Sequence, residues 1–226
     1  MTNDEAKAVE AVADTTGKAI DASRELGGFV SRFIGGPLEQ AAGIVEDKLK
    51  YLRWERQIRL MQRANAFLAE NGMSEPTRQI PMKIAIPLLQ GASLEENDEL
   101  QDRWAKLLVN AADRDSGVDV PRMFVSIMDH MDPLSAAVLD KIYSVPDEDA
   151  KEGIWTKNLP GSVILKPAEN EDMSLSTELE IALSNLALHR LVSSALFWGG
   201  TTGVTCVYKT DLGKAFLAAC TIRAEK

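Results

Sequence analysis

The sequence predicts a mainly helical protein with a single β-hairpin near its C-terminus. Through most of the chain, apolar residues recur three and four positions apart, which is the spacing of one buried helical face. Helix-start residues such as Asp132 and Thr210 stand directly before several of these runs. After Leu191 the periodicity changes, and two short β-prone runs flank a glycine-rich turn.

Composition limits the class of protein. The 226 residues can bury a core as one large domain or two small ones, and 45% of them are hydrophobic. Lys and Arg number 25 against 34 Asp and Glu, a formal net charge of -9. An acidic chain repels nucleic-acid phosphates and anionic lipid unless its positive charge is locally concentrated. The two cysteines, Cys206 and Cys220, lack a paired metal-ligand spacing, which favours reduced thiols.

The sequence shows no pattern typical of a secretory signal or a membrane-spanning helix. The N-terminal run MTNDEAKAVE has neither the basic leader nor the apolar core of a secretory signal. No window reaches the roughly 18 consecutive apolar residues of a membrane span. The most apolar candidate, residues 26–45, is interrupted by Arg32, Pro37 and Glu39. We therefore expect a cytoplasmic protein.

Residues 1–45 are predicted to form a helical, glycine-interrupted arm. Residues 4–25 carry one weak apolar face of small side chains, which needs a partner surface. Two glycine pairs and Pro37 follow, so a bend is expected near Gly35 and Gly36. The segment is either a hinge between helices or an amphipathic element that meets another subunit or a membrane. The candidate partner contacts in it are Phe29, Phe33, Ile34 and Leu38.

A helical domain is predicted over residues 46–131. A long helix should run from Ile44 to Leu68 and stop at Asn71-Gly72, a left-handed cap signal. Three arginines, spaced three and four apart, make a basic stripe on this helix. They are Arg56, Arg59 and Arg63. Such a stripe is either a solvated face paired with nearby carboxylates or a surface for an acidic protein or nucleic acid.

The most distinctive run of this domain is residues 86–113. Gly91 is expected to stop a proline-bounded apolar segment, and Ser93 with Glu96 reads as a capping box for the next helix. Acidic residues fill the first turns of that helix, where the helix dipole favours negative charge. Its buried face is predicted to centre on Trp104. A short helix should then follow, over about residues 121–131.

Residues 132–226 are predicted to form a winged-helix-like module. Asp132 and Pro133 restart a helix, and residues 146–173 read as a loop with short extended pieces around 163–165. Ser176 or Thr177 caps the next helix, strands follow at 191–198 and 204–208, and Thr210 opens the last helix. Helix, helix, hairpin and helix is the order of a winged helix. From residue 130 onward, however, the chain has 9 basic and 13 acidic residues. This net negative charge would repel DNA phosphates, so we expect poor DNA binding.

Catalytic, cofactor-binding and metal-binding residues are not predicted. His130 and His189 lie in different predicted helices, and neither has a Cys or a carboxylate at ligand spacing. No GxSxG elbow occurs, and the glycine pairs lack the lysine of a phosphate loop. We therefore expect a protein that is not an enzyme and uses no cofactor; an enzyme with an unfamiliar site is the alternative.

Residues 86–113 and the ending TDLGKAFLAAC (residues 210–220) resemble the abortive infection alpha family of prokaryotic proteins. The resemblance implies anti-phage defence, in which infected cells stop growing or die before phage are released, and it implies no catalytic residues. We expect a non-enzymatic defence protein that acts through protein contacts, most simply with a second copy of the same chain. The alternatives are a winged-helix nucleic-acid-binding regulator that uses the three arginines, and a membrane-associated effector that uses residues 26–45.

Overall fold

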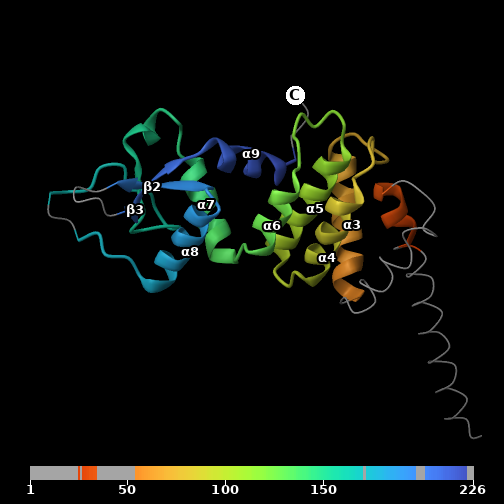
Figure 1. The fold of residues 1–226 in the computed structure, drawn as a ribbon, viewed down its shortest axis with the longest axis horizontal. Helices are drawn as coiled ribbons and strands as arrows, with labels where there is room; N and C mark the ends of the chain where they lie inside the picture. The colour runs from red at the N-terminus through yellow and green to blue at the C-terminus, as the bar shows by residue number, and fades with distance from the viewer. Residues whose placement is uncertain (1–24, 26, 35–53, 170–171, 197–201, 223–226) are drawn as a thin grey trace, which may run out of the picture.

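The computed structural model describes residues 25, 27–34, 54–169, 172–196 and 202–222 and shows a mainly helical protein with one small antiparallel sheet (Figure 1). Helices α3 to α6 form one half, and α7, α8 and the sheet form the other (Figure 1). In chain order the elements are α3 (Trp54–Glu70), α4 (Met82–Leu94), α5 (Asp98–Ala112), α6 (Arg122–Asp129), α7 (Pro133–Ser144), a 3-10 turn (Asp149–Glu152), β1 (Ile154–Trp155), α8 (Thr177–Leu188), β2 (Val192–Leu196), β3 (Thr202–Lys209) and α9 (Asp211–Ala219).

The sheet has three strands in the order β1-β3-β2, and both pairings are antiparallel. β2 and β3 form the predicted hairpin, with Val192 opposite Lys209 and a bulge between Ser194 and Ala195. β1 was not predicted as a strand, because it lies in the polar segment that reads as a loop. Ile154 pairs with Val207 across 53 positions of sequence, a contact that no local pattern reveals.

The two halves share one continuous apolar core, and α9 joins them. Asn110 of α5 is buried, and its Nδ2 donates to the carbonyl oxygens of Ala219 (2.8 Å) and Thr221 (3.0 Å) at the end of α9. The rings of Phe124 and Phe216 meet edge to face, with centroids 5.5 Å apart. The C-terminal helix, which directly follows β3, is therefore anchored on the helical half.

The predicted start of the helix at Ser93 is wrong. α4 continues through Pro87 and Gly91 to Leu94, and the buried Ser93 hydroxyl donates to the carbonyl oxygen of Leu89 (2.7 Å). The cap of α5 is Asn97, whose Oδ1 accepts from the backbone N–H groups of Glu99 and Leu100 (both 3.0 Å). Gly91 serves close packing instead of a stop, because a Cβ there would lie 2.7 Å from the Trp104 ring.

The other predicted helix boundaries that fall in the described residues are confirmed. Gly72 ends α3 with a φ of 67°, in the left-handed region. Asp132, Ser176 and Thr210 cap α7, α8 and α9, each accepting a hydrogen bond from the N–H three residues later. Trp104 is only 1% exposed, which confirms it as a core residue.

Residues 27–34 are helical and pack on the helical half, beside α3. Phe29 and Phe33 belong to the shared core, and their ring centroids are 4.8 Å apart. The backbone N–H of Ile80 donates to the carbonyl oxygen of Phe33 (2.9 Å). This part of the predicted arm is thus tied to the chain's own core. The predictions for residues 1–24 and 35–53, including Leu38, lie outside the described residues.

Candidate functional site

The basic stripe of α3 faces the acidic start of α5. Arg63 makes a bidentate pair with Asp102, with Nε–Oδ1 and Nη2–Oδ2 distances of 2.8 and 2.7 Å. Arg59 lies between both carboxylates, 2.9 Å from Asp102 and 3.3 Å from Asp98. Arg56 binds the Asp98 side chain and the backbone carbonyl of Glu96. All three predicted arginines therefore serve the contact between α3 and α5.

This arrangement leaves the stripe little positive charge to offer a partner. Hydrogen bonding to Asp102 raises the pKa of Arg63. The hydrogen bond from Arg56 lowers the pKa of Asp98, and the positive charge of Arg59 lowers it further. The buried Gln101 amide lies between the helices, where it accepts from Arg59 (2.9 Å) and donates to the carbonyl oxygens of Arg56 and Ala92. In the described residues the stripe is an intramolecular ion-pair network.

The Asp98→Asn variant should lose a small, pH-dependent part of the free energy of unfolding. Because the folded-state pKa of Asp98 is lowered, its contribution is present above about pH 4 and is lost as the pH falls through the folded-state pKa. Urea titrations of both proteins between pH 6 and pH 2 measure this. The gap between them should shrink at low pH. A gap that stays constant down to pH 2 would contradict the assigned pair.

The structure brings the two histidines together, which the sequence did not indicate. His130 follows α6 and His189 follows α8, and their ring centroids are 5.4 Å apart. His130 Nδ1 lies 2.8 Å from the carbonyl oxygen of Ser126. Burial lowers the pKa of His189, because it disfavours the charged imidazolium, and the nearby charge of His130 lowers it further. In the described residues no cluster of three or more His, Cys, Asp or Glu side chains could hold a metal ion.

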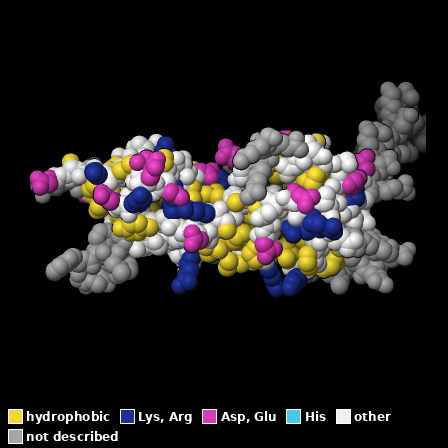
Figure 2. Space-filling model, turned by 90° about the horizontal axis from the view of Figure 1, so that it is seen from above, with side chains coloured by type: hydrophobic (Ala, Val, Ile, Leu, Met, Phe, Trp, Pro, Cys, Tyr) yellow, Lys and Arg dark blue, Asp and Glu magenta, His cyan; other side chains and the backbone are white. Residues whose placement is uncertain are grey.

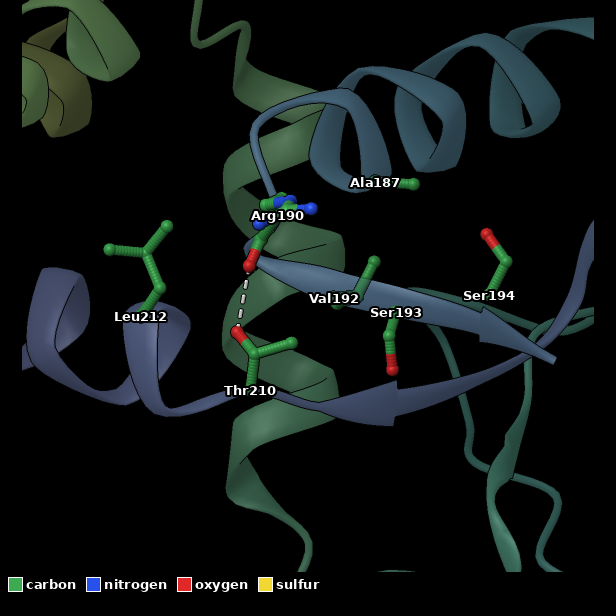
Figure 3. Close-up of a pocket in the computed structure, with 7 residues that line it drawn as sticks. All are labelled: Ala187, Arg190, Val192, Ser193, Ser194, Thr210 and Leu212. Atoms are coloured by element: carbon green, nitrogen blue, oxygen red, sulfur yellow. Dashed lines mark hydrogen bonds between the residues drawn. The ribbon is translucent and has the colours of Figure 1, made fainter.

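One pocket of the C-terminal half lies where α8, β2 and α9 meet (Figure 3). Its volume is about 510 Å³, within the range of ligand pockets. It is lined by Ala187, Arg190, Val192, Ser193, Ser194, Thr210 and Leu212. The Thr210 hydroxyl fixes one end of the pocket by donating to the carbonyl oxygens of Arg190 (2.8 Å) and Leu191 (3.2 Å).

Arg190 is the unusual residue of this pocket. Its φ is 57°, a left-handed conformation that favours glycine, and it is the one non-glycine residue with positive φ in the described part of the chain. Its side chain is exposed, and it makes no ion pair with the described residues. Local sequence patterns do not single out Arg190, because its backbone conformation depends on the contacts between α8, β2 and α9.

The outer face of α8 carries two exposed apolar side chains, Ile181 and Leu188, alongside the acidic Glu178. Ile181 is 64% exposed, and Leu188, at 78%, is the most exposed large hydrophobic side chain among the described residues. They lie seven residues apart, on the side of the helix opposite the buried Leu179, Leu183 and Leu186. The sequence did contain this signal, because these apolar residues fall outside the single buried face. Ile181 and Leu188 therefore place apolar surface on the outer side of α8.

Charge is spread rather than gathered on the face of the molecule seen from above. Acidic, basic and apolar side chains are interspersed there over the described residues (Figure 2). None of the described helices is both long enough and apolar enough to cross a membrane. Of the predicted partner contacts, Phe29 and Phe33 are buried and Ile34 is half-buried against the same core.

The fold and this surface define a mainly helical protein with a small antiparallel sheet and an apolar face on α8. A family model described as abortive infection alpha matches residues 55–220, so the chain belongs to the abortive infection alpha family. The expected family is thereby confirmed, and its name suggests a role in abortive infection defence. No curated protein and no solved structure matches the chain.

Proposed function

We propose that this protein is a non-enzymatic anti-phage defence protein that acts in abortive infection through protein contacts. Membership of the abortive infection alpha family supports the biological role. The observation that carries the protein-contact part is the exposed apolar face of α8, formed by Ile181 and Leu188. Aliphatic side chains left in water favour association with another apolar surface, since burying one contributes about 1.5–3 kcal/mol.

The proposal includes a winged-helix-like domain over residues 132–226, preceded by a helical domain over residues 46–131. The order α7, β1, α8, β2, β3 and the strand order β1-β3-β2 support it. In such a module α8 would occupy the place of the recognition helix. Here that helix presents isoleucine and leucine outward together with Glu178 and Glu180, which suits a protein partner better than a phosphate backbone.

A nucleic-acid-binding regulator is the second candidate, favoured by the same order of helices and strands. Two observations weigh against it: the acidic residues on α8, and the pairing of the three arginines of α3 with Asp98 and Asp102. A gel-shift titration with random double-stranded DNA at low salt separates the candidates. We expect no shift at micromolar protein, and a salt-sensitive shift would favour the regulator.

A second copy of the chain is the simplest protein partner. Light scattering at micromolar concentration measures the mass per particle, and we expect a value above that of one chain. Since Phe29 and Phe33 are buried in the chain's own core, the contact would use α8 or residues beyond the described ones. A monomer at these concentrations would leave a different protein as the partner.

Phage challenge tests the proposed role directly. Bacteria that express the full chain should be compared with a vector control, at low and at high multiplicity of infection. At low multiplicity the culture should survive and release fewer phage, whereas at high multiplicity it should still collapse, because infected cells do not recover. Equal plaque numbers and equal burst sizes with and without the protein, across a broad phage panel, would overturn the proposal.

A further inference from the structure

The two histidines of the chain lie side by side where the ends of α6 and α8 meet. His130 is the residue that follows α6, and His189 is the residue that follows α8. The side-chain Nδ2 of Asn185, on α8, donates to the backbone carbonyl oxygen of His130 (2.9 Å). The backbone carbonyl oxygen of Asn185 accepts from the backbone N–H of His189 (3.1 Å). One asparagine is therefore bonded to the backbone of both histidines and fixes their relative position.

The separation of the two imidazole rings fits two ligands of one metal ion. Their centroids are 5.4 Å apart, and their planes are tilted by 44°. A tetrahedral zinc ion holds each ligating imidazole nitrogen at about 2.0–2.1 Å. When the ion lies in the plane of both rings, this geometry places the two ring centroids about 5 Å apart. The fold therefore already holds two imidazoles at the spacing that one zinc ion requires.

The hydrogen bonding of the two rings leaves nitrogen lone pairs for a metal ion. His130 Nδ1 lies 2.8 Å from the carbonyl oxygen of Ser126, and only a protonated nitrogen can bond to that acceptor. In the neutral ring Nε2 then keeps its lone pair. Ligating histidines are commonly held in this way, with the other ring nitrogen bonded to a backbone carbonyl. The ring of His189 makes no hydrogen bond to the described residues, and its lowered pKa keeps it neutral at pH 7, as a metal ligand must be.

We propose that His130 and His189 together bind one zinc ion through their imidazole nitrogens. Imidazole is a ligand that suits zinc, whereas magnesium and calcium ions prefer oxygen ligands. No third His, Cys, Asp or Glu side chain joins the pair in the described part of the chain, so water fills the remaining coordination positions. His130 is exposed and His189 is half-buried, so the ion can exchange with solvent. Bound zinc would tie the end of α6, in the helical half, to the end of α8, in the other half (Figure 1).

Isothermal titration calorimetry of the untagged full chain with zinc chloride tests this proposal. We expect a saturable isotherm with one zinc ion per chain, and no binding of magnesium chloride under the same conditions. His130→Gln and His189→Gln each remove one of the two ligands and should weaken zinc binding about tenfold or more, since even the loss of an outer-shell partner costs that much. Asp129→Asn removes the exposed carboxylate next to His130 and should bind zinc like wild type. Unchanged zinc affinity in both histidine variants would overturn the proposal.

A second measurement uses the wild-type chain and so does not depend on the folding of a variant. Because the sequence has two histidines, the nitrogen NMR spectrum of its imidazole rings contains two sets of signals. Zinc should shift Nε2 of His130 and one ring nitrogen of His189, and both shifts should saturate at the same zinc concentration. A shift of one ring alone, or of neither, would contradict a shared ion. Both experiments measure metal binding only, so their failure would refute this inference and leave the proposed defence role standing.

Discussion

Replacing Trp104 with alanine should lower the free energy of unfolding by about 3–5 kcal/mol, the usual cost of a large buried aromatic truncation. Trp104 is 1% exposed, and its ring lies against Gly91 of α4, so its removal opens a cavity between α4 and α5. Urea denaturation measures the change. Leu94→Ala on the exposed end of α4 is the control and should stay within about 0.5 kcal/mol of wild type. A Trp104→Ala midpoint equal to that of the control would contradict the packing.

Phe33→Ala should be comparably destabilising, by about 3–5 kcal/mol. Phe33 is 0% exposed and packs against Phe29, and its backbone carbonyl accepts from Ile80. The half-buried neighbour Ile34 gives a matched control, because Ile34→Ala removes less buried surface and should cost clearly less. If Phe33→Ala unfolded at the same urea concentration as wild type, residues 27–34 would be a peripheral arm and not part of the core.

The burial of Phe33 also affects how the deletion of residues 1–45 should be interpreted. A deletion of residues 1–45 removes Phe29 and Phe33 from the core together with any oligomer contact. A change in particle mass on deletion would then mix unfolding with dissociation. Point variants on exposed residues are therefore the better test of association.

Local signals predicted most of the helices. Asp132, Ser176 and Thr210 cap their helices as expected, because each cap needs only a side-chain oxygen and an N–H three residues away. The same reasoning failed at Ser93. There Gly91 and Pro87 look like helix breakers in sequence, but packing of Gly91 against Trp104 of the next helix keeps α4 continuous. Tertiary contact outweighed local propensity at that point.

The sequence predicted less of the candidate site than of the helices. The pairing of Arg56, Arg59 and Arg63 with carboxylates was one of two open interpretations, and the acidic start of α5 supplied the partners. The outward face of α8 could have been found, because Ile181 and Leu188 lie opposite its buried face. The pocket could not have been predicted, because it is formed where α8, β2 and α9 meet and depends on the left-handed backbone conformation of Arg190.

The most direct test of the protein-contact claim changes only the outer face of α8. The double variant Ile181→Gln, Leu188→Gln removes the exposed apolar side chains of α8 while keeping good helix propensity. Leu94→Gln removes an exposed leucine (60%) elsewhere on the surface. The measurement is plaque formation on cells that contain equal amounts of each protein. The double variant should fold like wild type and lose protection, while Leu94→Gln should protect fully. Undiminished protection by the double variant at equal abundance would contradict a defence role that works through this face.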